Sequence, residues 1–132
     1  MIRPEEDILF VKSPKIVTVE KVVGLIKQFK TLDINPPKGI LIDLRWRTNL
    51  LGHDEAQKIV RVYLNAPEFF RGRIVFLSTT TGQYGTSRMV ATLAEINNYD
   101  AHAAKDTMKA CELLGIKSIP SDEDYARDGF EV

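Results

Sequence analysis

The chain has 132 residues, 44% of them hydrophobic, and its 18 basic side chains balance its 18 acidic ones. This length and apolar content suffice for one globular domain with its own core. A net charge of zero argues against nucleic acid as a partner, because domains that bind it usually carry a strong basic excess.

Targeting and redox signals are weak. No apolar run approaches the roughly 18–20 residues of a membrane span, so we do not expect an integral membrane protein. Residues 1–6 lack the basic-then-apolar order of a signal peptide. The single cysteine, Cys111, excludes an internal disulfide and a cysteine-based metal cluster, and we expect it to pack on a helix face. A cytoplasmic location fits best, and we expect no cofactor and no metal.

Charge is unevenly distributed along the chain. Residues 119–132 contain five acidic residues and one basic residue. We therefore expect residues 1–118 to form one domain and residues 119–132 to form an acidic C-terminal tail on the surface. Tyr125 and Phe130 of this tail could still pack back onto the domain or onto a neighbouring subunit.

The first third of the chain predicts a strand and a helix. Ile8–Val11 is a β-prone apolar run, and Ile16-Val17 is a second short pairing segment. Thr18 is a plausible N-cap for a helix that ends before Pro36 and Pro37. Its predicted core stripe is Val19, Val22, Val23, Ile26 and Phe29.

Two more strand–helix pairs follow. Ile40–Leu44 is apolar apart from Asp43, as expected for a strand covered on both faces, and an acidic first turn at 54–55 opens the next helix. Arg73–Ser78 is the third strand. A polar loop over 79–85 then leads into a helix whose predicted apolar face is Met89, Val90, Leu93 and Ile96.

A fourth strand–helix pair closes the domain. Residues 99–104 alternate weakly and predict a strand. Asp106 is placed to cap a helix carrying Met108, Cys111 and Leu114, and Gly115 stands where a left-handed cap is usual. The strand–helix order, repeated four times, predicts a single-domain α/β fold: a mostly parallel sheet of four to five strands with about four packed helices.

This order of elements resembles the STAS domain, the fold of anti-sigma-factor antagonists and of sulfate-transporter cytoplasmic tails, and in particular its SpoIIAA-like branch. Residues 8–20 are similar to the family's opening hairpin and first helix, and Ile40–Leu44 to its central strand. Residues 72–77 are similar to its next strand. Residues 84–89 resemble the start of its third helix, and residues 106–115 its closing segment, without the usual Trp.

The resemblance implies a non-enzymatic regulatory or protein-interaction module. The family's antagonists are switched by phosphorylation of a serine at the start of the second helix. That position falls here at Gly52 or His53, neither of which is a serine. The serine switch is therefore expected to be missing, and the surface from Trp46 to Tyr63 is the expected partner face.

Three residues after the second main strand are candidate contacts. If strand alternation persists, Arg45 and Arg47 point to the same side and can clamp a carboxylate or phosphate, with Trp46 as an apolar wall. The alternative is that Trp46 covers the end of the sheet and the arginines pair with surface acids. Asp43 is expected to hydrogen-bond a neighbouring loop backbone.

Further candidates stand at two predicted helix starts. His53 could carry a proton or accept a phosphate, or it could simply be an exposed capping histidine. Thr80, Thr81 and Tyr84 belong to a hydroxyl-rich stretch, 79–87, that could hold an anion at a helix N-terminus, or whose threonines could only cap the helix. Arg88, one turn inside that helix, could face the same loop. We interpret His102 as structural or exposed.

Three functions remain open on the sequence alone. The first is the STAS-type module, with a protein partner or a second copy of the chain. The second is a protein that binds a small anion or a lipid-like ligand between the loops after the second and third main strands. The third is an enzyme that uses His53. Homodimerisation is suggested by the aromatic content of Tyr63, Phe69, Phe70 and Phe130.

Overall fold

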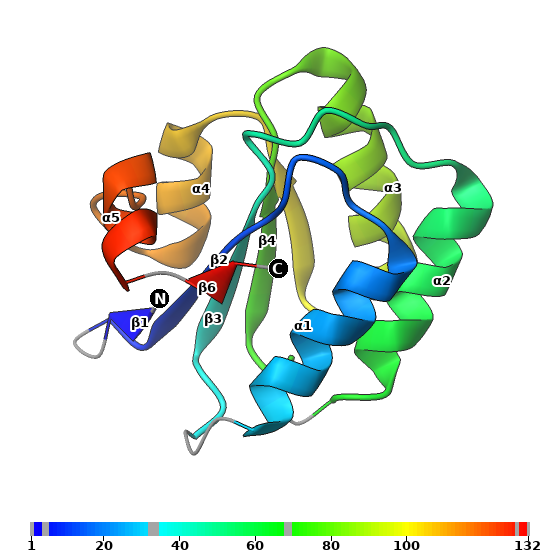
Figure 1. Ribbon diagram of the computed structural model, residues 1–132, viewed down its shortest axis with the longest axis horizontal. Helices are drawn as coiled ribbons and strands as arrows, with labels where there is room; N and C mark the ends of the chain where they lie inside the picture. Colours follow the sequence, from blue (N-terminus) through cyan, green and yellow to red (C-terminus); the bar gives the residue numbers. More distant parts are fainter. Residues whose placement is uncertain (1, 4–5, 32–34, 68–69, 129, 132) are drawn as a thin grey trace.

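The computed structural model describes residues 2–3, 6–31, 35–67, 70–128 and 130–131, and it has the predicted α/β fold (Figure 1). Its strands and helices, in chain order, are β1 (Ile2–Arg3), β2 (Ile8–Lys12), α1 (Val19–Thr31), β3 (Gly39–Asp43), α2 (His53–Leu64), β4 (Arg73–Leu77), α3 (Thr81–Ile96), β5 (Ala101–Ala104), α4 (Thr107–Leu114), α5 (Asp122–Asp128) and β6 (Phe130–Glu131).

The sheet is built on four parallel strands that lie side by side in chain order, β2, β3, β4 and β5. The short β1 pairs antiparallel with the start of β2, and β6 pairs parallel with its end. Because right-handed crossovers between strands added in one direction put their helices on one face, α1, α2 and α3 share a face. Helices α4 and α5 cover the other face (Figure 1).

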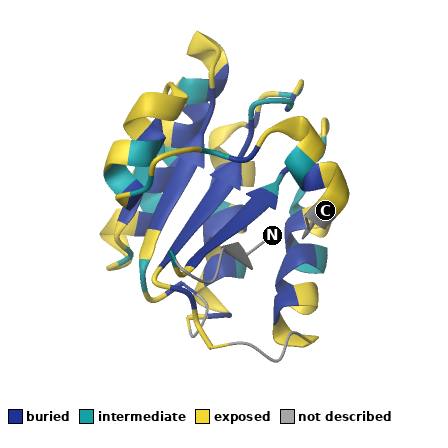
Figure 2. Ribbon diagram, turned by 90° about the vertical axis from the view of Figure 1, so that its left-hand side faces the viewer, coloured by how far each residue is buried: buried dark blue, intermediate teal, exposed yellow. Residues whose placement is uncertain are grey.

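Both faces of the sheet are buried, and the parallel strands form the buried centre of the molecule (Figure 2). Alternate residues of each strand enter different cores, because successive side chains of a strand point to opposite faces. Leu9 and Val11 join the larger core under α1, α2 and α3, whereas Ile8 and Phe10 join the smaller core under α4 and α5. This two-sided burial explains the uninterrupted apolar runs of the sequence.

Three predicted helix caps are present. The Thr18 hydroxyl accepts a hydrogen bond from the Lys21 backbone N–H at 3.2 Å, and the Asp106 carboxylate accepts one from the Lys109 N–H at 2.7 Å. Gly115 ends α4 in the left-handed conformation, with φ of 68°. These local signals work because each satisfies backbone groups that a helix end leaves without partners.

Other local predictions were wrong. Ile16-Val17 forms no strand, because the side-chain amide of Asn49 bonds both the N–H and the carbonyl of Val17, each at 2.8 Å. Helix α3 begins at Thr81 and includes most of the segment predicted as a loop. Ile96 and Met108, expected in the core, are exposed, and Cys111 is half-buried.

The acidic C-terminal segment is not simply an arm in solvent. Ser121 and Asp124 form a reciprocal cap at the start of α5: each side chain accepts a hydrogen bond from the other residue's backbone N–H. Tyr125 is 1% exposed and belongs to the smaller core. Phe130, which we also considered, lies in β6, whose backbone pairs with β2.

Candidate functional site

The loops that follow β3 and β4 meet at the carboxyl edge of the sheet, as predicted for consecutive parallel strands. One guanidinium nitrogen of Arg47, Nη2, donates a hydrogen bond to the backbone carbonyl of Gln83 at 3.1 Å. The Gln83 side-chain amide donates in return to the backbone carbonyl of Arg47. This reciprocal pair fixes the first turn of α3 against the loop before α2.

The side chains of Arg45 and Arg47 lie on opposite faces of the sheet, so the shared clamp, one of the two arrangements considered for them, does not form. The strand ends at Asp43, and the backbone N–H of Arg47 bonds the Leu44 carbonyl at 3.1 Å. A backbone hydrogen bond between residues three apart is typical of a β-turn, in which the alternation of side chains along a strand no longer holds. Arg45 turns toward α5, and Arg47 turns toward α3.

Asp43 is the centre of a polar cluster on the α5 face. Its buried carboxylate accepts hydrogen bonds from Arg45 Nη2 at 2.8 Å and from the Tyr125 hydroxyl at 3.0 Å. It also accepts the backbone N–H of Arg45 at 3.3 Å, the local contact expected for it. Burial lowers the pKa of Arg45, but the hydrogen bonds and charge of Asp43 outweigh this, so the pKa is raised.

Trp46 belongs to the same cluster. Its ring meets the Tyr125 ring edge-on, with centroids 6.0 Å apart. The Lys12 ammonium and the Arg45 guanidinium lie 4.8 Å and 4.7 Å from its centroid. These contacts combine edge-to-face packing with cation–π attraction. Trp46 therefore holds the C-terminal segment on the domain, in keeping with the alternative in which it covers the end of the sheet.

Arg47 lies in a different environment, on the face of α1, α2 and α3. Its side chain is 4% exposed. Within the described part of the chain, Nη2 is the only nitrogen of its guanidinium with a hydrogen-bond acceptor, and the buried Nε has none. Burial lowers the pKa of Arg47. A buried donor without a partner is costly, so this arginine requires an explanation.

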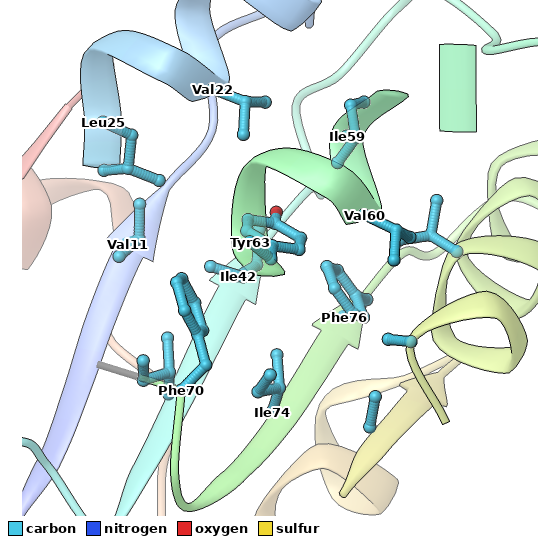
Figure 3. Close-up of a cluster of buried hydrophobic side chains, with 14 of the residues drawn as sticks. Val11, Val22, Leu25, Ile42, Ile59, Val60, Tyr63, Phe70, Ile74 and Phe76 are labelled. Carbon is cyan, nitrogen blue, oxygen red and sulfur yellow. The ribbon is translucent and has the colours of Figure 1, made fainter. Parts of the chain in front are cut away.

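The same arginine lines a cavity of about 40 Å³ between the carboxyl edge of the sheet and the three helices. Most of its walls are aliphatic or aromatic, and they come from α1, α2, β2, β3 and β4 among other elements. Figure 3 shows several of these side chains pointing toward one another. The apolar walls visible there are Val11, Val22, Leu25, Ile42, Ile59 and Phe76. Its polar lining is Ser13, Lys21, Arg47, Tyr63 and Ser87.

Two polar wall residues have different bonding. The Ser87 hydroxyl is paired with that of Ser78 at 2.7 Å, and either can be the donor. Tyr63 is buried, and its hydroxyl makes no hydrogen bond to any residue that the structure describes. Burial raises the pKa of Tyr63, so the hydroxyl stays neutral. Two residues that line the cavity, Arg47 and Tyr63, thus carry donors that have no partner among the described residues.

The remaining predicted site residues lie outside this cavity. Thr80 caps α3, as the alternative for it proposed, by accepting the Gln83 backbone N–H at 3.4 Å, and Thr81 is exposed beside it. His53 opens α2 and shares a shallow surface hollow with Arg88, and Tyr84 lines another. His102 pairs on the surface with Asp100 at 2.6 Å.

The sequence signals for the site were uneven. Arg47 was predicted as a contact residue, but Gln83, Tyr63 and Ser87 were not. Tyr63 stood on a core stripe, and Gln83 and Ser87 stood in or beside a segment expected to be a loop. The helical spacing of 83 and 87 places both on one face of α3, a relationship that appears only once the helix is known to begin at Thr81.

Comparisons with protein-family models, with curated proteins and with solved structures found no match. Within the described ranges, no three His, Cys, Asp or Glu side chains group as a metal site would need. No helix in that part of the chain combines the length and apolar character required to cross a membrane.

Proposed function

We propose that this protein is a non-enzymatic binding protein whose small ligand occupies the cavity lined by Arg47. The observation that carries the proposal is a buried guanidinium with unused donors at the wall of a mostly apolar cavity. Ligand sites commonly combine apolar walls with a few well-placed polar groups, and they occur at the carboxyl edge of parallel sheets.

The energetic argument rests on the cost of leaving a buried donor unbonded, about 1–3 kcal/mol and more for a charged group. A ligand that accepts these hydrogen bonds removes that cost while its apolar part contacts the walls. Stable folds rarely retain such a cost without a compensating role. Ligand binding supplies that role for Arg47.

The proposal is tested by thermal denaturation and amide NMR with a panel of small anionic and neutral apolar molecules. A ligand that binds only the folded state raises the melting temperature by an amount that grows with the logarithm of its concentration relative to its dissociation constant. We expect the amide signals of Val22, Ile59 and Val90 to move on binding. If no molecule in the panel moves these signals, the proposal fails.

A matched pair of variants tests whether ligand binding depends on the cavity wall and not on α1 or α2 in general. Val22→Ile adds a methylene to the cavity wall and should weaken binding. Val62→Ile makes the same change on α2 at a half-buried residue outside the lining, and should leave binding unchanged. Equal effects of the two substitutions would contradict the assignment of the cavity.

A STAS-type interaction module is the second candidate. The strand–helix order supports it, together with an exposed apolar pair at the carboxyl edge. Leu50 is 63% exposed and Ile16 is 52% exposed, and their loops are joined by the bond from the Thr48 N–H to the Lys15 carbonyl. Apolar side chains exposed together on two joined loops suit a protein partner or a second copy of the chain, whereas a single exposed apolar residue would not.

This second candidate is tested by affinity capture from the native host and by light scattering. Leu50→Asp should abolish capture or self-association, whereas Ile96→Asp changes an exposed apolar residue at the far end of α3 and should not. A mass of 14.9 kDa with no specific capture would contradict it. Of the aromatics that suggested a dimer, Tyr63 and Phe70 are buried within one chain, and Phe69 lies outside the described residues.

A further inference from the structure

We propose that the cavity ligand is a short aliphatic monocarboxylate, whose carboxylate accepts hydrogen bonds from the Arg47 guanidinium while its chain contacts the apolar walls. This inference deepens the proposed function and rests on it. It names the chemical class of the ligand and the residue that selects it.

The charge of the lining favours an anion. The described residues around the cavity include the cations Arg47 and Lys21 but no acidic side chain. The acceptor that Arg47 already has, the Gln83 backbone carbonyl, is neutral. Removing a charge from water without an opposite charge is costly, so a bound anion gains from the site and a bound cation loses.

Among the described residues the one buried carboxylate is that of Asp43, and it is already engaged elsewhere. Asp43 directs its carboxylate to the opposite face, where Arg45 and Tyr125 hold it. Arg45 thus has an internal carboxylate, and Arg47 has none. A carboxylate brought by a ligand would give Arg47 the kind of partner that Arg45 finds within the protein, with the strength of a charge-assisted hydrogen bond.

The number of donors favours a carboxylate over sulfate or phosphate. A carboxylate has two oxygens, and a guanidinium can serve both at once. A tetrahedral oxyanion has more oxygens to satisfy. Beyond Arg47, the buried donors of the lining are hydroxyls, and that of Ser87 is already paired with Ser78.

Size and wall chemistry favour a short hydrocarbon chain. A cavity needs a volume of about 10–15 Å³ to hold one water molecule. The cavity of about 40 Å³ therefore holds roughly three groups the size of a water molecule. Acetate, propionate and butyrate have about four, five and six non-hydrogen atoms, so the shortest acids come closest to this size and a long chain exceeds it. The walls formed by Val22, Ile42 and Phe76 can pack against such a chain, and these side chains have no hydrogen-bonding groups.

The experiment is a calorimetric and NMR titration of the whole chain at constant ionic strength. The probes are sodium acetate, propionate, butyrate and octanoate, each beside the neutral amide of the same length, with sodium sulfate as the inorganic anion. We expect propionate or butyrate to bind at least about tenfold more tightly than its amide, a ratio that corresponds to about 1.4 kcal/mol. Octanoate should bind more weakly than the best short acid.

Two arginine variants locate the carboxylate. Arg47→Gln should lower affinity for the best acid at least tenfold and leave affinity for its amide little changed. Arg61→Gln removes an exposed arginine from α2, away from the cavity lining, and should change neither. If Arg47→Gln does not fold, Arg47→Lys is used, which keeps the charge but loses the planar fork and should also weaken binding.

The outcomes separate the two proposals. Equal binding of acid and amide at the cavity would overturn the carboxylate inference and leave the proposed binding function standing. The carboxylate inference would also be overturned if sulfate bound more tightly than the best acid, or if the preference for the acid over its amide were lost only in Arg61→Gln. Failure of every probe, together with unmoved cavity signals in the wider panel, would overturn both.

Discussion

Arg45 and Arg47 are close in sequence but lie on opposite faces of the sheet, in different environments. Arg45 finds a buried carboxylate, a backbone carbonyl and an aromatic ring, all within the chain. Arg47, two residues later, finds one neutral carbonyl and an apolar cavity. The comparison separates an arginine whose charge is paired within the chain from one whose buried guanidinium has a donor without a partner among the described residues.

The α5 face should be the more fragile of the two. Tyr125→Ala removes a fully buried ring that packs on Trp46 and hydrogen-bonds Asp43. We expect it to lower the free energy of unfolding by about 3–5 kcal/mol, as other large-to-small aromatic substitutions do. Urea denaturation measures the change. Tyr125→Phe, which keeps the ring and loses one hydrogen bond, should cost about 1–2 kcal/mol. Equal losses in both variants would show that the ring does not pack as described.

Replacing each arginine by Met tests the comparison directly. Arg45→Met leaves the buried Asp43 without its cation and should cost about 2–3 kcal/mol, a figure already reduced for the partial exposure of Arg45. Arg47→Met loses one hydrogen bond but also removes unbonded buried donors, so we expect a change within about 1 kcal/mol. Chemical denaturation of both variants under one set of conditions gives the difference. If Arg47→Met lowered the free energy of unfolding by more than Arg45→Met does, Arg47 would be the arginine that stabilises the fold.

The smallest expected effect concerns the attachment of α5 at low pH. Hydrogen bonds from the Ser121 backbone N–H and then from its side chain, together with Arg127, hold the pKa of Asp124 below its ordinary value of 3.8. A lowered folded-state pKa gives stability that is present above the ordinary value and is lost as the pH falls through the folded-state value. We therefore expect a slight loosening of α5 below about pH 4, which the fluorescence of Trp46 would report. Asp124→Asn should remove this pH dependence; an unchanged profile would contradict it.

Much of the fold could be predicted from the sequence because its signals are local. The runs 40–44 and 73–78 predicted as strands match β3 and β4 to within one residue at each end, and the caps at Thr18 and Asp106 open helices as expected. Other signals were misinterpreted although they were present. Ser121 and Asp124 have the spacing of a capping box, yet the acidic composition around them suggested a tail in solvent.

Errors elsewhere came from contacts between distant segments. Nothing near Val17 in sequence indicates that Asn49 will satisfy its backbone groups and replace a strand partner. Ile96 and Met108 fit an apolar helical stripe, but each stands where no other element covers it. Amphipathic spacing predicts which side of a helix is apolar, whereas coverage depends on the neighbouring elements.

The sequence by itself determined the α/β class, the order of strands and helices, and the edge of the sheet where polar loops gather. These follow from periodicity, capping residues and the chirality of crossovers, all of which act over short stretches of chain. Only the tertiary structure decided that Arg45 and Arg47 part to opposite faces. The turn after Asp43 breaks strand alternation, and the partners that distinguish the two side chains come from residues 83 and 125, far away in sequence.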